Sequence, residues 1–490
     1  MEMHTIRRKL LKKVNQIVLR CLHDSWRKNV NDVVIVSAVR TPITGFVGDH
    51  PPLSAIHLGA VAIDAALKQS AVPLEAVQQV YFGNVLATGA GQAPARQATL
   101  MAGLSKHVCC TTVSASSVTG IKTIMFAAQA IKLGLTDAAI AGGMESLSQM
   151  SRSRLESGDV TLADSLVADG TAENPAKSFL RKLGITKDKR INYTKESYMR
   201  LRKAYRAGLF DLELVPLRIM QTSRMPIVVT EDEQRPMPNT LAAEEKETML
   251  WLGDGAAALV LTSNEMARKW NLKPLARIIA YNESKTNDAD FVMAPALAIK
   301  RLLHHINYKK DDVALWELDD SFSVVPLAVI KDLELNPNKV NVHGSAMCLG
   351  HPIAMSGARL VTHLTHALQP GEIGCAAITS YTGNAAALLV QKISYNIENE
   401  RNKLPQLTLY TKNECSLCDE LVKELEIYFD GQYTLQKIDI TEKENIRFLR
   451  LYKYDIPVLF LNGQFLCMHK LNVNLLGRKL EELRLKSTNY

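Results

Sequence analysis

Short apolar segments alternate with amphipathic helical segments along most of the sequence, and this alternation restricts the fold more than any other feature. Residues 33–39 predict a buried strand, residues 58–70 have the spacing of an amphipathic helix, and residues 77–85 predict a second strand. Strands that are separated by helices pair in parallel, because the helix carries the chain back across the sheet. The sequence therefore predicts an α/β fold built on a parallel sheet.

An internal similarity suggests that this α/β pattern occurs twice. Residues 118–143 and residues 352–380 both run from a helix through a turn into an apolar strand. We therefore expect two similar halves that each deliver the start of a helix to a shared centre. Residues 150–250 lack clean apolar strands and are richer in charge, which predicts an inserted and partly helical lid. The polar residues 395–405 predict a linker before a separate small domain.

The positive charge of the chain is concentrated at its N-terminus. The net charge of the chain is +8. Residues 1–30 carry eight Lys or Arg against Glu2 and Asp24, so the net charge of this segment is +6. The rest of the chain is nearly neutral, which argues against nucleic acid as a partner. An amphipathic, basic and acid-poor start predicts a mitochondrial transit segment; a solvated basic helix of a cytoplasmic protein or a membrane-surface helix is the alternative.

Two further absences in the sequence narrow the class of protein. No run of about 18 uninterrupted apolar residues occurs, so the sequence predicts no transmembrane segment. The eight cysteines do not form the framework of a secreted disulfide-rich domain, since only Cys109/Cys110 and Cys415/Cys418 are close in sequence. A reducing compartment fits this cysteine usage best.

Five sequence blocks in residues 31–394 resemble thiolases of the acetoacetyl-CoA type. These blocks are NDVVIVSAVRTPITGF, YFGNVLATGAGQAPARQA, AIAGGMESLS, GDGAAALVLTS and KVNVHGSAMCLGHPIAMSGARL. The resemblance implies the thiolase fold, with two similar βαβαβαββ halves at residues 31–270 and 271–394 and a loop domain at residues 150–250. It also implies a homodimer or homotetramer and the condensation of two acetyl-CoA molecules, or its thiolytic reversal, with a CoA thioester as the ancestral ligand.

The position of the thiolase nucleophile holds a serine in this chain. By resemblance, the family cysteine falls on Ser117, and the catalytic histidine of the family's GHP block is retained as His351. A serine hydroxyl is not ionised near neutral pH, so Ser117 needs a general base in contact with it. A pair of Ser117 and His351 could form an oxyester, which leaves acyl transfer open. The alternative is that Ser114, Ser116 and Ser117 only cap the following helix.

Two other catalytic positions of the family are also changed. The second cysteine falls on Thr379, which has no anionic form near neutral pH and so cannot act unaided as the base for a carbon acid. The asparagine of the family's NEAF block falls on Asp319, and a carboxylate that faces a developing oxyanion has the wrong charge. The family has several glycines after the second cysteine; here one of them becomes Tyr381, and Gly383 alone remains.

The segments that contact CoA in thiolases also depart from the family pattern. Where the family has small residues against pantetheine, this chain places Thr248, Leu250 and Trp251, and the large side chains would fill the tunnel. The lid is shortened at residues 165–177, where the family has a His and Met pair beside CoA. We therefore expect binding of a CoA thioester to be impaired together with catalysis.

The C-terminal part predicts a different domain with a dithiol motif. Residues 407–426 run from a strand through a loop and a CxxC motif into a helix, and residues 456–466 predict a strand hairpin that follows a proline. A CxxC motif beside a βα unit indicates thioredoxin-like redox chemistry. Residues 406–490 resemble a glutaredoxin-like family, which implies a small thioredoxin-like α/β domain that reacts with small-molecule thiols and possesses a glutathione site.

The glutaredoxin-like resemblance also implies roles for particular residues. Cys415 matches the attacking thiol, Cys418 the resolving thiol, Lys412 the lysine that steers glutathione, and Pro457 the cis-proline that faces the dithiol. The alternatives are two inert cysteines or a metal site, for which Cys467 and His469 are the further candidate ligands. The acidic neighbours of the pair oppose thiolate formation, so we expect modest activity.

Three interpretations of the whole chain follow from these motifs. In the first, an impaired thiolase part is an oligomeric scaffold for a glutaredoxin-like dithiol domain. In the second, the chain is an active acyl-CoA acyltransferase that uses Ser117 and His351. In the third, it is a fusion of two proteins that act independently.

Overall fold

The computed structural model describes residues 32–45, 53–87, 89–149, 183–221, 224–233, 253–393 and 404–488. The predicted basic helix at residues 1–30 and most of the predicted linker lie outside these ranges.

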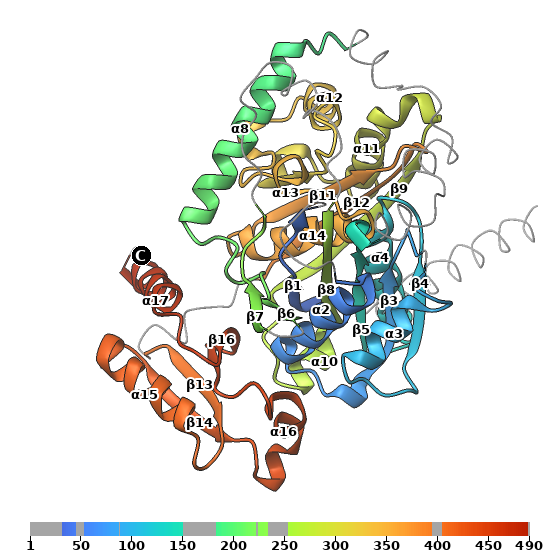
Figure 1. Ribbon diagram of the computed structural model, residues 1–490. Coiled ribbons are helices and arrows are strands. Elements are labelled where there is room, and N and C mark those ends of the chain that lie inside the picture. The colour runs from blue at the N-terminus through green and yellow to red at the C-terminus, as the bar shows by residue number, and fades with distance from the viewer. Residues whose placement is uncertain are drawn as a thin grey trace, which may run out of the picture.

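The first half of the large domain contributes five main strands to a single mixed sheet, and residues far apart in sequence form neighbouring strands (Figure 1). Along the chain these elements are β1 (Val33–Arg40), α2 (Ala55–Ser70), β3 (Val77–Gly83), α3 (Pro94–Met101), β4 (Cys109–Val113), α4 (Thr119–Lys132), β5 (Ala138–Glu145), β8 (Gly253–Ser263) and α10 (Asn264–Lys269). They pair in the order β1-β8-β5-β3-β4, and the short β2 (Thr44–Gly45) pairs with β8. Strands β3, β4 and β5 are parallel as predicted, but β8 is antiparallel to both neighbours. The crossover strands thus form the predicted parallel part of the sheet, and β8, which the chain enters from the insertion after β5, is the last strand of the βαβαβαββ order.

The second half repeats this arrangement. Its elements are β9 (Ala276–Lys285), α11 (Ala294–Ile306), β10 (Leu315–Leu318), α12 (Val324–Leu333), α13 (Ala346–Leu349), α14 (Ile353–Ala367), β11 (Ile373–Thr379) and β12 (Asn384–Lys392). They pair in the order β10-β11-β12-β9, and an isolated bridge joins Trp316 of β10 to Val340. Val340 thus takes the place that β4 has in the first half. The predicted pair of βαβαβαββ halves is confirmed.

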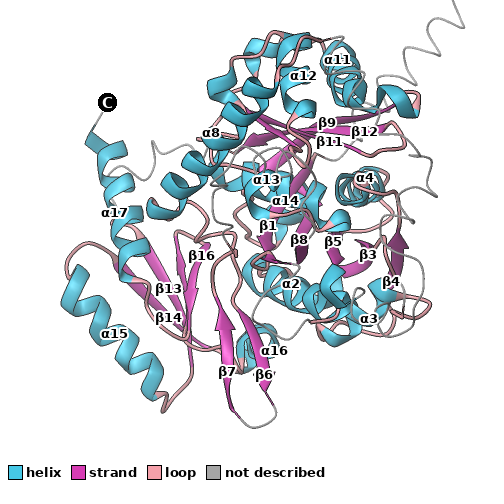
Figure 2. Cartoon of the chain, turned by 45° about the horizontal axis from the view of Figure 1, so that its top comes forward, coloured by secondary structure: helices cyan, strands magenta, loops and turns pink. Residues whose placement is uncertain are grey.

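Helices α4 and α14 lie in the centre of the molecule, between the strands of the two halves (Figure 2). Their apolar side chains form the largest buried cluster together with inner-face residues of both halves. Helix α2 covers the outer face of the first half, and α11 covers the outer face of the second half. The residues that precede α4 and α14 are therefore delivered to the same central region.

Two glycines allow α4 and α14 to cross at very short range. A Cβ atom on Gly120 would lie 2.3 Å from the backbone nitrogen of Ala358, and one on Gly357 would lie 2.8 Å from the backbone nitrogen of Ile121. No larger residue fits at such an approach without moving one helix. The crossing therefore fixes the starts of the two helices against each other, and with them the loops that carry Ser117 and His351.

The insertion between β5 and β8 of the first half is described in part. Helix α8 (Lys187–Arg206) is capped by Thr186, whose hydroxyl accepts a hydrogen bond from the backbone of Lys189, and it adds Tyr198 and Leu201 to the central cluster. A hairpin follows, made of β6 (Leu217–Gln221) and β7 (Arg224–Val229). The described part of the insertion is therefore partly helical, as predicted.

The C-terminal domain is a four-stranded sheet flanked by helices. Its elements are β13 (Gln406–Thr411), α15 (Ser416–Phe429), β14 (Thr434–Asp439), α16 (Ile446–Tyr452), β15 (Val458–Leu461), β16 (Gln464–Met468) and α17 (Val473–Thr488). The strand order is β14-β13-β15-β16, with β13 parallel to β14 and the other pairs antiparallel. This arrangement confirms the predicted small thioredoxin-like α/β domain.

The two domains are in direct contact. The hydroxyl of Tyr452, on α16, donates a hydrogen bond to the backbone oxygen of Lys68 at 2.6 Å, and Lys68 forms an ion pair with Asp455. Arg478, on α17, forms an ion pair of 2.7 Å with Asp211 of the insertion. The C-terminal domain is therefore docked against both α2 and the insertion.

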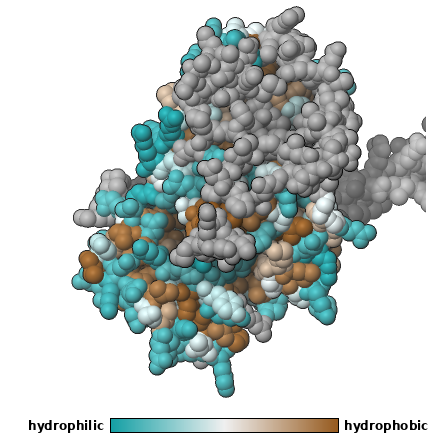
Figure 3. Space-filling model, viewed as in Figure 1, coloured by the Kyte–Doolittle hydropathy of each residue, from teal (hydrophilic) through white to brown (hydrophobic). Residues whose placement is uncertain are grey.

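Figure 3 shows polar and apolar residues mixed over the face in view. Among the described residues, no helix combines the length and the apolar character that spanning a membrane requires. The C-terminal domain exposes several large apolar side chains, among them Ile427 and Tyr454, which are 74% and 80% exposed. Scattered apolar residues of this kind are ordinary on protein surfaces.

Candidate functional site

Ser117 and His351 meet in the centre of the large domain. The Oγ atom of Ser117 lies 3.1 Å from Nε2 of His351, although the two residues are 234 positions apart in sequence. Both side chains are buried. The N-cap of α4 is Val118, and no side chain caps this helix end. The alternative that Ser117 only caps a helix is therefore wrong, since its hydroxyl contacts the histidine instead.

Asp319 lies on the other side of the same imidazole ring. Its Oδ1 atom is 3.3 Å from Nδ1 of His351, and its Oδ2 atom accepts a hydrogen bond of 2.5 Å from Ser321. Burial alone would raise the pKa of the Asp319 carboxyl, but His351 and Ser321 outweigh this effect and lower the pKa. The carboxylate is therefore ionised at neutral pH and is directed at the histidine.

A small pocket opens at the Ser117 and His351 pair. Three aromatic rings from different segments form part of its wall: Phe291, Phe322 and Tyr381. The centroid of the Tyr381 ring is 4.9 Å from that of Phe322 and 5.5 Å from that of Phe291. Tyr381 stands where the family pattern has small glycines, so this wall is crowded by an aromatic cluster that the sequence reasoning missed.

The hydroxyl of Thr379 is turned toward the backbone. Its Oγ1 atom lies 3.0 Å from the carbonyl oxygen of Asn384 and 3.2 Å from that of Phe291, and it can donate to one of them. Gly383 has φ = 73°, and a Cβ atom there would lie 2.5 Å from the backbone oxygen of Thr286. Thr379 lines the same pocket as Ser117, but its hydroxyl is held as a donor, which agrees with the expectation that it is not a base.

The three residues that the family pattern puts against pantetheine belong to a segment outside the described ranges. Thr248, Leu250 and Trp251 lie outside the described residues, as does the shortened lid at residues 165–177. Their predicted effect on a CoA thioester stays a prediction.

Glu145 is a buried residue that supports the site and that the sequence reasoning did not single out. Its carboxylate accepts hydrogen bonds from the backbone nitrogens of Val85 and Leu86, in the loop after β3, and of Ala354, in the first turn of α14. Burial raises the pKa of Glu145 to about 7, although these N–H donors act to lower it. The residue ties the start of α14 to the first half, and its place in the AIAGGMESLS block was the available signal.

A second buried charge cluster lies close to the central helices. Arg40 donates to Glu213 at 2.7 Å and to both oxygens of Asp232 at 2.6 and 2.8 Å, and Glu213 also contacts Nδ1 of His363 at 3.0 Å. All four residues are less than 5% exposed. These contacts join β1 to the insertion and to α14. Each carboxylate of the cluster therefore has a basic partner within the cluster.

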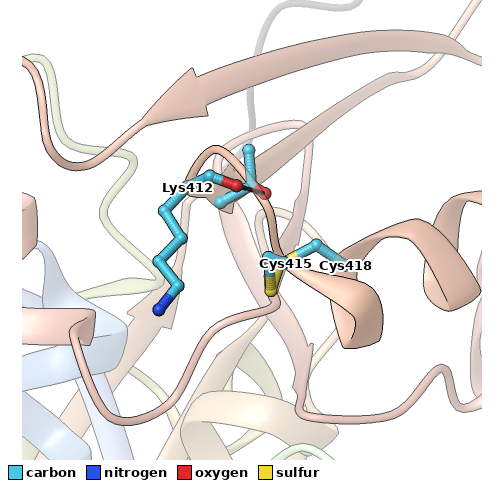
Figure 4. The surroundings of a disulfide bond; sticks show 4 residues. Lys412, Cys415 and Cys418 are labelled. Atoms are coloured by element: carbon cyan, nitrogen blue, oxygen red, sulfur yellow. Dashed lines mark hydrogen bonds between the residues drawn. A yellow bond between two sulfur atoms is a disulfide. The ribbon is translucent and has the colours of Figure 1, made fainter.

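In the C-terminal domain, Cys415 and Cys418 form a disulfide at the start of α15 (Figure 4). Cys415 is the N-cap of α15, and the preceding residue Glu414 has φ = 57°, in the left-handed region. Lys412 is exposed and extends beside the sulfur pair. A helix N-terminus stabilises a thiolate through its unpaired N–H groups and its dipole.

The structure also describes Pro457 and Cys467, two other residues of this domain that the sequence singled out. The Ile456–Pro457 peptide bond is cis, and Ile456 belongs to the same apolar cluster as the two cysteines. Cys467 is buried, and burial raises the pKa of its thiol to about 11. Among the described residues, no group of three or more His, Cys, Asp or Glu side chains could hold a metal ion.

Both domains match models of known protein families. Residues 33–265 match the thiolase N-terminal domain, residues 272–392 match the thiolase C-terminal domain, and residues 406–481 match a glutaredoxin-like domain. The chain is 43% identical to the mitochondrial acetyl-CoA acetyltransferase of Mus musculus over 415 residues, which cover 79% of this chain and 98% of the relative.

The chain belongs to the thiolase family. The human mitochondrial acetyl-CoA acetyltransferase is 41% identical over 392 residues, covering 75% of this chain and 92% of that protein. The Acat5 thiolase from Ascaris suum, solved in complex with coenzyme A, has a TM-score of 0.67 and 35% identity, and the match covers 74% of this chain and all of that one. This thiolase-family chain differs from a thiolase alone by its C-terminal glutaredoxin-like domain.

Proposed function

We propose that this protein is a thiol–disulfide oxidoreductase carried on a thiolase-fold scaffold that has lost thiolytic cleavage. The observation that carries the proposal is the disulfide between Cys415 and Cys418 at the start of α15. A reduced Cys415 would attack a disulfide of a small thiol such as glutathione, and Cys418 would resolve the mixed disulfide. Lys412, exposed beside the pair, is placed to attract a carboxylate of that thiol.

Two features of the large domain support the loss of thiolysis. Cleavage of a 3-ketoacyl thioester needs a group that moves a proton at carbon, and the hydroxyl of Thr379 is neither basic nor free of backbone partners. The aromatic ring of Tyr381 crowds the pocket beside Phe322, where CoA thioesters would have to place their reacting end. A CoA thioester is therefore the ancestral ligand rather than a substrate for thiolysis.

The contacts between the two domains support a chain that acts as one protein. Lys68 of the large domain binds both Tyr452 and Asp455 of the C-terminal domain. These polar contacts between the domains favour two parts that act together over two fused proteins that act independently. The mitochondrial relatives, together with the basic segment at residues 1–30, support import into mitochondria.

The oxidoreductase proposal is tested with the full-length protein. Purified chain should reduce a small mixed disulfide of glutathione in the presence of reduced glutathione, with oxidised glutathione measured by a coupled reductase. A rate equal to that of the uncatalysed exchange would remove the proposal.

We expect that Ser117→Cys will not restore thiolysis. The variant regains a soft nucleophile beside His351, but Thr379 still supplies no base, and general base catalysis is worth about 10²- to 10⁴-fold. The variant should stay at background when acetoacetyl-CoA cleavage is followed with free CoA present. CoA-dependent turnover well above the wild type would show that the nucleophile was the one missing part.

We also propose that the large domain assembles as a homodimer or homotetramer, as the thiolase resemblance implies. Light scattering at micromolar concentration should therefore give a mass of at least two chains. A clean monomer of 54.3 kDa would contradict the scaffold part of the proposal.

A further inference from the structure

Ser117, His351 and Asp319 are arranged in the order that a serine nucleophile needs. Ser117 Oγ lies 3.1 Å from His351 Nε2, and His351 Nδ1 lies 3.3 Å from Asp319 Oδ1. Among the described residues, neither the Nδ1 atom nor the Oδ1 atom has a hydrogen-bond partner, so the 3.3 Å ion-pair contact between them is the polar interaction that each makes. The exposed fractions of the three residues are 7%, 2% and 2%, so water screens these contacts little.

The charges set the direction of proton transfer. Asp319 is ionised, because His351 and the Ser321 hydroxyl lower the pKa of its carboxyl despite burial. A carboxylate next to Nδ1 favours the imidazole tautomer with its proton on Nδ1. The lone pair of Nε2 then faces Ser117 and can accept the hydroxyl proton. Asp319 thus supports the histidine as a base, where an amide could not stabilise the imidazolium in the same way.

The backbone also presents Ser117 as a nucleophile. The residue before it, Ser116, has φ = 51°, in the left-handed region that non-glycine residues rarely adopt. This conformation turns the chain sharply between β4 and α4 and sets Ser117 in the wall of the pocket. Ser117 lies directly before Val118, the N-cap of α4, so the positive end of that helix favours negative charge developing there.

We propose that Ser117, His351 and Asp319 form a catalytic triad that hydrolyses short-chain acyl esters or thioesters through an acyl-serine intermediate. The pocket beside Ser117 is small and is walled in part by Phe291, Phe322 and Tyr381, so its size favours a short acyl group over a long one. The activity goes beyond the oxidoreductase proposal, because it requires neither the dithiol nor thiolysis.

The reaction balances with water as the second substrate. Ser117 Oγ attacks the carbonyl carbon while His351 takes the hydroxyl proton; the bond from carbon to the leaving oxygen or sulfur breaks, and His351 protonates that leaving group. His351 next takes a proton from water, whose oxygen attacks the acyl-serine. The ester bond to Oγ breaks, Ser117 regains its proton, and a carboxylic acid leaves. Ser117 and His351 are the catalytic residues, and Asp319 is a positioning residue.

The test uses a serine-reactive fluorophosphonate and p-nitrophenyl acetate on the full-length protein. Mass spectrometry should locate the phosphonate on Ser117. Ser117→Ala should lose the label, and His351→Ala should slow labelling and ester hydrolysis by about 10²-fold or more. Ser114→Ala is the matched control, because Ser114 is an exposed serine of the same segment, and it should behave as wild type.

The role of Asp319 is tested by a conservative pair of variants. Asp319→Asn should slow labelling as His351→Ala does, whereas Asp319→Glu should recover part of the rate, which a merely structural role would not predict. Thermal unfolding of each variant checks that it is folded. Labelling of Ser117 that is equally fast in wild type and His351→Ala, or no labelling of Ser117 in folded wild type, would overturn the proposal. Failure of the disulfide exchange assay would leave this result untouched, so the two proposals fail separately.

Discussion

Cys415→Ser will abolish glutathione-dependent disulfide reduction by this protein. The side chain at the N-cap of α15 is the one whose thiolate the helix favours, and a serine hydroxyl cannot replace it as a nucleophile toward sulfur. We expect the catalysed rate to fall by on the order of 10²-fold or more, to the uncatalysed background, because thiolate attack is the step that starts the exchange. The coupled reductase assay measures this directly.

Two further variants of the same domain separate the roles of its cysteines. Cys418→Ser keeps the attacking thiol, so it should accumulate a mixed disulfide between Cys415 and glutathione that mass spectrometry detects. Cys467→Ser is the matched control, because Cys467 is buried and its thiol pKa is raised to about 11, so it should leave the rate unchanged. Equal losses in Cys415→Ser and Cys467→Ser would contradict the assigned roles.

Arg40→Met will strongly destabilise the large domain. The guanidinium is fully buried and hydrogen-bonds both Glu213 and Asp232, so its removal leaves two carboxylates without their main cationic partner. Breaking a buried ion pair by removing one partner costs about 3–5 kcal/mol. Urea unfolding followed by tryptophan fluorescence should show this loss, because the four tryptophans all precede the C-terminal domain.

Lys122→Met provides the comparison for Arg40→Met. Lys122 forms an ion pair of 2.6 Å with Glu283, but the two side chains are 26% and 38% exposed. A pair of this kind contributes about 0–1 kcal/mol, because water screens it and both side chains lose freedom. If the two variants lost similar amounts of stability, the Arg40 cluster would not be the structural support that its geometry indicates.

Local patterns predicted the elements of the fold well. The apolar run at residues 33–39 became β1, and the helix predicted at residues 58–70 became α2, which begins slightly earlier at its Ser54 cap. The local apolar pattern by itself does not give the antiparallel direction of β8, because strand direction depends on where the chain re-enters the sheet. Neither strand pairing nor the route of the insertion is encoded in the local alternation of apolar residues.

The candidate sites were predictable to different degrees. The CxxC pair could be read directly, since the sequence separation of three residues already places both sulfurs at one helix start. Tyr381 was identified in the sequence as a changed glycine, but its stacking with Phe291 and Phe322 needed the packing of three distant segments. Glu145 was missed because its partners Val85 and Ala354 are backbone groups, which carry no sequence signature.

The sequence by itself determined the two-domain α/β organisation, the thiolase and glutaredoxin-like resemblances, and the replacement of a cysteine nucleophile by Ser117. It also showed that Asp319 stands where an amide is expected, and charge alone then suggested an impaired oxyanion site. The tertiary structure alone shows which group Asp319 contacts. Asp319 lies against Nδ1 of His351, while Ser117 lies against Nε2 of the same ring. The physical reason is that α4 and α14 cross at Gly120 and Gly357, which fixes the loops that precede them and so selects the ring atom that each side chain reaches.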